Sequence, residues 1–213
     1  EMGHAMHSHF SNRTQPFPKA DYSIFVAEVA STLNEALLAD YVIDKERNRK
    51  RKLYLLGEQL EGFRQTMFRQ AMFAEFELAM YRRAEGGEAL TADALSELYL
   101  GVARRYYGHD EKVVRVDDRY AIEWAYIPHF YYNFYVFQYV TGITAATAMA
   151  ELIKRDGAAV RDRYIDELLS AGCAEAPIEI LRNAGVDLTD AGPYDIAMAV
   201  FERCIDEAEA LLD

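Results

Sequence analysis

Apolar positions recur along most of the chain at the spacing of a helix. Over residues 45–84 large apolar side chains follow one another at intervals of three and four, which is the stripe of a helix packed in a bundle. This stripe consists of Leu53, Leu56, Leu60, Phe63, Met67, Ala74, Leu78 and Tyr81. Over residues 24–41 apolar or small residues occupy nearly every face, which is typical of a helix in the middle of a protein.

Capping and breaking residues divide the rest of the chain into further helices. Asp21 or Ser23 caps the helix that starts at residue 24, and Thr91 caps the first helix after the long one. Pro128 is placed as the first-turn proline of another helix. The further helices are predicted over 1–11, 91–107, 129–155, 158–170, 176–184 and a last stretch that ends at 212. Since the pattern contains no strand, internal repeat or low-complexity linker, it predicts an all-α helical bundle folded as a single domain over 1–213.

Composition and charge exclude several classes of protein. Lysine and arginine number 23 against 35 aspartates and glutamates, and the net charge of −12 repels the phosphate backbone of nucleic acids. Residues 44–52 hold six basic side chains, which we interpret as a solvated helix start or an interdomain surface. No apolar run approaches the ~18 residues that span a bilayer. Cys173 and Cys204 are too few for a disulfide framework and are predicted to be buried, reduced thiols. We therefore expect a soluble, cytoplasmic protein that binds neither nucleic acid nor membrane.

Glu28 is the first candidate functional residue because it interrupts an apolar helix. It lies in the run from Ile24 to Ala30, where its carboxylate is expected to be buried. A bare buried charge is costly, so Glu28 needs an arginine or lysine, a proton or a metal ion as its partner. A buried ion pair and a metal ligand are both open at this point.

The first four residues form a second candidate site. Glu1 and His4 share one helix face, so both side chains can reach one centre. A di-iron bundle would need a second Glu-x-x-His, but tyrosines stand three residues before the histidines at 109 and 129. In a zinc peptidase helix, His-Glu-x-x-His, His4 would be a ligand and Glu1 the general base, and the first histidine would precede residue 1. A solvated helix end is the simple alternative.

Two more histidines follow closely. His7 lies on the same general face as His4, whereas His9 turns away. Both are expected to be second-sphere or surface groups, and we leave them out of the predicted metal site.

Residues 120–139 are rich in tyrosine. Tyr131, Tyr135 and Tyr139 are four apart and are expected to form one helical stripe, with His129 beside Pro128. An aromatic packing seam is the simple interpretation for most of these side chains. The functional interpretation is that phenol hydroxyls and the imidazole point at an oxyanion in a cleft.

Together these residues resemble one family, oligoendopeptidase F of the thimet-oligopeptidase-like zinc metallopeptidases. Residues 1–8, Glu-Met-Gly-His-Ala-Met-His-Ser, resemble the family's His-Glu-x-Gly-His-x-x-His-Ser helix without its leading histidine. Residues 23–32, Ser-Ile-Phe-Val-Ala-Glu-Val-Ala-Ser-Thr, resemble the segment that carries the third zinc ligand. Residues 127–135 are similar to its His-Phe-Tyr-x-x-Phe-Tyr segment, and 177–187 to its C-terminal region. The resemblance covers essentially the whole chain and implies the helical catalytic half of a longer zincin-type oligopeptidase, which agrees with a chain that opens without an initiator methionine.

The resemblance assigns the metal side of the site residue by residue. It implies that Glu1 is the general base and that His4 and Glu28 are zinc ligands, while the first histidine ligand has no counterpart in this chain. The implied activity is zinc-dependent hydrolysis of peptide bonds in short oligopeptides. In that reaction Glu1 takes a proton from the attacking water at the zinc and passes it to the leaving amine.

The resemblance also assigns the substrate side. His129 and Tyr135 are implied to donate hydrogen bonds to the tetrahedral oxyanion from the opposite wall of a channel. Tyr131 and Tyr132 are implied to contact the substrate, and the assignment of the oxyanion donor among the three tyrosines stays open.

Two expectations follow from a resemblance to part of a longer protein. With two of three protein ligands present, zinc is expected to be absent or partial in this chain, which we expect to be inactive alone. Apolar side chains that normally face the N-terminal region of the same protein are expected to be exposed, and such patches favour homo-oligomers. The alternative function is a non-catalytic helical domain used for packing or association, and a di-iron carboxylate protein comes third.

Overall fold

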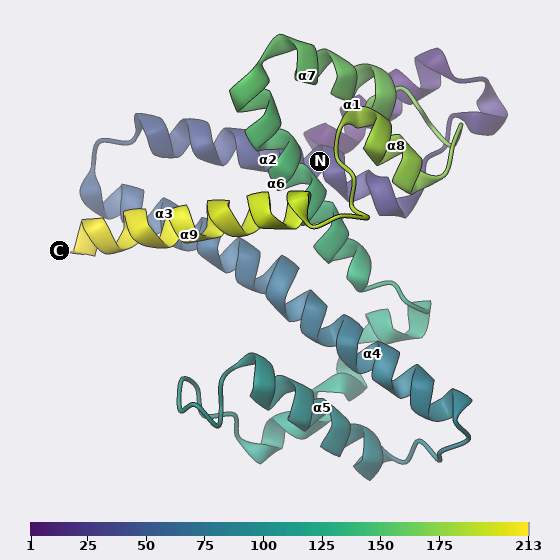
Figure 1. Cartoon of the computed structure of the whole chain (residues 1–213), viewed down its shortest axis with the longest axis vertical. Helices are drawn as coiled ribbons and strands as arrows, with labels where there is room; N and C mark the ends of the chain where they lie inside the picture. The colour runs from purple at the N-terminus through teal and green to yellow at the C-terminus, as the bar shows by residue number, and fades with distance from the viewer. Residues whose placement is uncertain (213) are drawn as a thin grey trace. The chain divides into compact units, whose positions relative to one another are not determined.

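The computed structural model describes residues 1–212, and every regular element in that range is helical (Figure 1). The α-helices are α1 (Met2–Thr14), α2 (Ile24–Lys45), α3 (Arg49–Phe63), α4 (Arg69–Glu85), α5 (Ala92–Tyr106), α6 (Phe137–Asp156), α7 (Ala158–Tyr164), α8 (Pro177–Ala184) and α9 (Gly192–Leu212). The 3-10 helices are η1 (Phe17–Lys19), η3 (Asp118–Tyr126) and η4 (Pro128–Tyr132), and the π-helical turns are η2 (Arg64–Phe68) and η5 (Ile165–Leu169). The all-α prediction is confirmed.

The chain divides into two compact units. The first combines Glu1–Arg64 with Thr141–Asp213, and the second is Gln65–Val140. Each unit has a buried apolar core of its own. The single catalytic domain over 1–213 stays a prediction.

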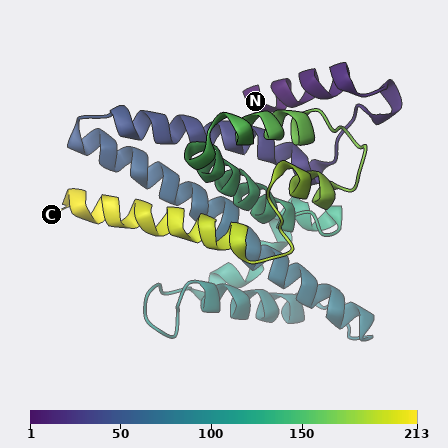
Figure 2. The same cartoon turned by 45° about the horizontal axis from the view of Figure 1, so that its top comes forward.

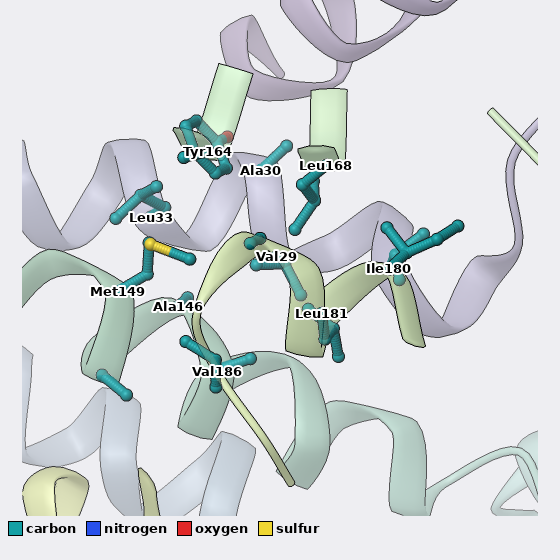
Figure 3. Packing of buried hydrophobic residues seen from close by; sticks show 14 of the residues in the cluster. Val29, Ala30, Leu33, Ala146, Met149, Tyr164, Leu168, Ile180, Leu181 and Val186 are labelled. Atoms are coloured by element: carbon teal, nitrogen blue, oxygen red, sulfur yellow. The ribbon is translucent and has the colours of Figure 1, made fainter. Parts of the chain in front are cut away.

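The first unit is built around α2 and α6. One face of α2 buries Val29, Ala30 and Leu33 against Ala146 and Met149 of α6 (Figure 3). The same core takes in side chains of α7, η5 and α8, namely Tyr164, Leu168, Ile180 and Leu181. α1 packs on α2, and α9 lies beside α3, as the views in Figures 1 and 2 agree. Because burial of each large aliphatic side chain contributes about 1.5–3 kcal/mol, this core fixes the position of α2.

The second unit is built from α4 and α5, with η3 packed on α5. Its buried side chains are mostly aromatic or large and aliphatic: Met72, Phe73, Phe76, Leu95, Tyr99, Val102, Ala103 and Val136. Glu123 of η3 accepts a hydrogen bond from the hydroxyl of Tyr99 and pairs with Arg69 of α4. These two contacts tie η3 to both helices.

The helix starts predicted from capping residues at Ser23 and Thr91 are confirmed. Ser23 caps α2, since its hydroxyl accepts the N–H of Phe25 at 3.2 Å, and Thr91 caps α5 in the same way through Ala94. The predicted long helix over 45–84 is corrected in two ways. It begins later, at α3, where Asn48 is the N-cap, and it contains the π-helical turn η2 before α4.

The predicted helix over 129–155 is wrong in its first third. Pro128 does begin a helical turn, but that turn is the short 3-10 helix η4, and α6 starts only at Phe137. Between them Asn133 and Phe134 have φ values of 49° and 55°. Two consecutive residues with left-handed φ interrupt a right-handed helix, so the three tyrosines spaced four apart do not share one helical stripe.

The two cysteines differ in exposure. Both are free, but Cys204 is buried and Cys173 is exposed, so the prediction of two buried thiols is wrong for Cys173. Burial raises the pKa of the Cys204 thiol to about 11. None of the helices within residues 1–212 is both long and apolar enough to cross a membrane.

Candidate active site

The start of α1 is held against α2 by a close helix contact. The backbone N–H of His4 donates to the Ser31 hydroxyl at 3.1 Å, and the backbone nitrogen of Glu1 lies 3.4 Å from the same oxygen. A Cβ added at Gly3 would lie 2.3 Å from the carbonyl oxygen of Ala30. Only glycine at position 3 therefore permits this approach of α1 to α2.

This contact brings His4 and Glu28 together. The distance from His4 Nε2 to Glu28 Oε2 is 3.8 Å, between side chains that are 33% and 37% exposed. The predicted burial of Glu28 is thus wrong, because more than a third of its side-chain surface is open to solvent. The neighbour of its Cβ on α6 is Gly142, which has no side chain to cover it. The carboxylate pairs with the imidazole rather than with an arginine or lysine.

The pair fits part of a zinc site in donor type and spacing. Zinc takes histidine nitrogen and carboxylate oxygen at bonds of ~2.1 Å, which puts two ligands of a tetrahedral ion about 3.4 Å apart. The observed 3.8 Å is close to this separation. Within residues 1–212, no three His, Cys, Asp or Glu side chains gather closely enough to hold a metal ion. His4 and Glu28 therefore fit two positions of a zinc ligand set, while Glu1 lies exposed at the N-cap of α1.

His7 and His9 are divided between core and surface. His7 is fully buried and stacks on Tyr22, with ring centroids 3.6 Å apart. Neither ring nitrogen of His7 has a hydrogen-bond partner of good geometry. The nearby backbone of Leu168 raises the pKa of His7 only weakly. Burial, reinforced by the neighbouring charge of His4, lowers the pKa of His7 to about 4. His7 is therefore a neutral packing group, whereas His9 is exposed.

The second unit gathers three tyrosine rings around His129. The imidazole stacks on Tyr135 at 5.6 Å between ring centroids and meets Tyr132 and Tyr139 edge-on at 6.3 and 6.0 Å. Tyr135 also contacts Tyr132 and Tyr139, at 5.8 and 5.6 Å. Tyr131 lies outside this cluster and is 83% exposed. The predicted pair His129 and Tyr135 is thus brought together, while Tyr131 is not.

Glu77 of α4 is a residue that the sequence reasoning missed. Its side chain is only 1% exposed, and Oε1 accepts the backbone N–H of Phe134 at 2.8 Å. Burial raises the pKa of this carboxyl, and the bond from Phe134 opposes the shift. The predicted stripe placed Leu78 in the core instead, yet Leu78 is 39% exposed. The available signal was a carboxylate at helical spacing from Phe73 and Met80, as at Glu28.

The chain is similar to known peptidases. The model of peptidase family M3 matches residues 1–200. The chain belongs to peptidase family M3. Over 212 residues it is 48% identical to the oligopeptidase PepF of Bacillus subtilis. This match covers all of this chain and 31% of that protein. The resemblance to oligoendopeptidase F is therefore confirmed.

Two solved structures of peptidases have the same fold over this chain. The oligoendopeptidase-F of Enterococcus faecium superposes with a TM-score of 0.87 and 40% identity, over 100% of this chain and 38% of that one. A putative peptidase of Chlamydophila abortus superposes with a TM-score of 0.90 and 41% identity, over 98% of this chain and 34% of that one. The chain spans about a third of the length of the curated M3 relatives that it matches.

Proposed function

We propose that this chain carries the catalytic portion of a zinc-dependent endopeptidase that hydrolyses peptide bonds in short oligopeptides. The observation that carries the proposal is the approach of His4 Nε2 and Glu28 Oε2 to 3.8 Å, from two different helices of a family M3 chain. The names of its relatives, an oligopeptidase and oligoendopeptidase F, support a peptide substrate. Because those relatives are about three times as long, the activity is proposed for the whole gene product.

The metal side of the proposed site consists of three residues. His4 and Glu28 would hold zinc, which when bound polarises the scissile carbonyl and makes water a nucleophile near neutral pH. Glu1 stands three residues before His4 and is not a ligand in this proposal. Its carboxylate accepts a proton from the attacking water and donates it to the leaving amine, so it acts first as base and then as acid.

The substrate side consists of the aromatic residues of the second unit. We propose that His129 and Tyr135 donate hydrogen bonds to the oxyanion that forms on the scissile carbonyl. The stacking of these two rings supports a shared role, since each restricts the rotation of the other. Tyr132 and Tyr131 are proposed to contact the peptide, Tyr132 from within the cluster and Tyr131 from its exposed position.

The chain by itself is proposed to bind zinc weakly and to be inactive, because His4 and Glu28 supply only two donors. We also propose that it self-associates, since large apolar side chains such as Phe17 and Leu38 are 95% and 62% exposed. The interaction partner in the whole protein would be its own N-terminal region. A cytoplasmic location is proposed because both cysteines are free, as a reducing compartment favours.

The test begins with the gene. A histidine codon directly before that of Glu1 completes the His-Glu-x-x-His motif, and any other codon there overturns the proposal. The full-length gene product is then assayed for zinc content and for cleavage of an internally quenched peptide. One zinc per chain together with cleavage supports the peptidase. A protein with neither metal nor activity would instead be a packing domain, and two irons per chain would indicate the di-iron alternative.

A further inference from the structure

The backbone that precedes Tyr135 has an unusual conformation. Asn133 and Phe134 both have left-handed φ values, 49° and 55°, and neither is glycine. Side chains disfavour this region because Cβ approaches the following carbonyl oxygen. Such residues persist only where surrounding contacts over-determine them, and they cluster at functional sites. The contacts that hold this turn therefore decide where the adjacent rings lie.

The turn is anchored at both ends in the core of the second unit. On one side the ring of Phe130 packs edge-on against Phe73 and Phe76 of α4, at 5.6 and 5.3 Å between centroids. On the other side Val136 is fully buried in the same core. Residues 131–135 must bridge these two anchors, and the left-handed turn lies inside this bridge.

Within the bridge, α4 contacts Phe134 twice. Glu77 Oε1 accepts its backbone N–H at 2.8 Å, and the ring of Tyr81 packs on the ring of Phe134 at 4.5 Å. Glu77 and Tyr81 are four residues apart and so share one face of the helix. A carboxylate that is 1% exposed would be costly without a hydrogen bond, and the bond it makes is to this turn.

We propose that Glu77 is a positioning residue, whose buried carboxylate holds the left-handed backbone at Asn133 and Phe134 and thereby fixes the stacked rings of Tyr135 and His129. Tyr135 follows Phe134 directly, so the torsions of the turn set the direction of its side chain. His129 depends on the same turn through its stacking on Tyr135. The catalytic consequence rests on the proposed peptidase function, but the structural role does not.

The structural role is tested on this chain by NMR, with Glu77→Leu and Glu77→Gln. Leucine fills the buried space without an acceptor, whereas glutamine keeps a carbonyl oxygen for Phe134. In Glu77→Leu we expect the Phe134 amide to exchange at least about tenfold faster and the His129 ring protons to lose the ring-current shift from Tyr135. Glu77→Gln should match the parent chain in both measurements. Unchanged exchange and ring shifts in Glu77→Leu, or equal damage in Glu77→Gln, overturn the proposal.

Two further variants control the experiment. Glu75→Leu removes a carboxylate from the same helix, but that side chain is 42% exposed and pairs with Arg105, so Phe134 and His129 should be unaffected. If Glu77→Leu fails to fold, Glu77→Asp decides the question, because it keeps the charge and withdraws the acceptor from Phe134. Glu77→Asp should then show the faster exchange and the altered ring shifts, and parent-like values would overturn the proposal.

The catalytic consequence is tested on the full-length gene product. Misplacing a reacting group by about 1 Å can cost up to ~10²-fold in rate. Glu77→Leu and Glu77→Asp should therefore lower kcat by about 10- to 100-fold with KM and zinc content nearly unchanged, and Glu77→Gln should retain kcat. If the parent protein has no peptidase activity, the proposed function fails while the NMR result still decides the role of Glu77. A parent-like kcat in an active protein that carries Glu77→Leu removes the catalytic consequence.

Discussion

The two groups of candidate residues are held in place in contrasting ways. In the first unit, His4 and Glu28 project from the regular helices α1 and α2, and the absence of a side chain at Gly3 lets these helices approach. In the second unit, His129 and Tyr135 flank a left-handed turn whose backbone N–H, at Phe134, donates a hydrogen bond to the buried carboxylate of Glu77. One group is placed by helix packing, and the other by a strained turn with specific contacts.

This difference has an energetic side. A side chain on a regular helix needs no backbone strain to reach its position, whereas each non-glycine residue in a left-handed conformation costs of order 1–2 kcal/mol. The metal-side residues should therefore tolerate changes elsewhere, provided that the contact between α1 and α2 survives. The positions of the aromatic residues should change when a contact to the turn is removed, even if no aromatic residue is itself substituted. Variants on the metal side should change metal binding or proton transfer, and variants on the aromatic side should change rate with the metal kept.

The largest expected effect is that of Glu1→Gln in the full-length gene product. The substitution removes the group that accepts and returns the water proton, which lowers kcat by about 10²- to 10⁴-fold. Zinc content should stay at the parent level, because Glu1 is not a proposed ligand. Glu28→Gln provides the contrast, since it should lose zinc and activity together. Elemental analysis measures the zinc content and peptide cleavage measures the activity, and an active, zinc-loaded Glu1→Gln protein would refute the assignment of Glu1 as the general base.

Tyr135→Phe should have the next largest effect and tests the aromatic side. It deletes one hydroxyl donor while the ring still stacks on His129, so kcat should fall by about 10²- to 10³-fold with KM little changed. His129→Ala should resemble it in kind. Tyr54→Phe is the matched control, because that side chain is 65% exposed and belongs to neither group of proposed site residues. A full kcat in Tyr135→Phe with a loss in Tyr131→Phe or Tyr132→Phe would reassign the donor.

The same contrast explains which residues the sequence could identify. His4 lies on the regular helix α1 with Glu1 at its N-cap, and the helical periodicity that predicts this helix also predicts the all-α fold. Glu28 was singled out as a carboxylate in an apolar helix, but its predicted burial is wrong, because coverage of a helix face depends on the elements packed against it. Ser31, which holds α1 through the His4 N–H, carried no pattern of its own.

The aromatic side was predicted less well for a physical reason. The composition of residues 127–135 identified the segment, but a helix was expected where left-handed residues break it. That break is maintained by Glu77, about sixty residues away in the sequence, and by the burial of Phe130 and Val136 at either end. No local periodicity encodes such a contact. Glu77 was missed because one apolar stripe was predicted over the whole of residues 45–84, through the π-helical turn η2. In the structure, α3 packs against α9 and α4 packs against α5, so the two helices do not share one buried face.

A third prediction concerns the pH dependence of the first unit. Burial lowers the pKa of His7 in the folded state to about 4, from about 6.5 in an unfolded chain. Between these values the unfolded chain binds more protons, so the free energy of unfolding should fall as pH drops from about 6.5 to 4, by about 3 kcal/mol in all. His7→Phe keeps a ring beside Tyr22 and removes the titration, so urea unfolding at pH 7 and pH 4.5 should show a smaller loss. His9→Gln, at an exposed position, should keep the parent slope, and an identical slope in His7→Phe would exclude this cause.

The smallest expected effect tests whether the metal-side pair depends on the close helix contact. The new Cβ of Gly3→Ala would meet backbone atoms of Ala30 and Ser31 at 2.3–2.4 Å, and backbone cannot yield as a flexible side chain can. α1 must then move away from α2, at a cost of about 1–3 kcal/mol in the free energy of unfolding.

Gly57→Ala is the matched control for this substitution. Gly57 is also helical but exposed, and an added Cβ there meets nothing within 4 Å. Alanine is the better helix former by about 0.5–1 kcal/mol, so Gly57→Ala should raise the free energy of unfolding while Gly3→Ala lowers it. Urea titration at pH 7 measures both. If Gly3→Ala is as stable as Gly57→Ala, the approach of α1 to α2 does not depend on glycine. The geometry that brings His4 to Glu28 would then need another cause.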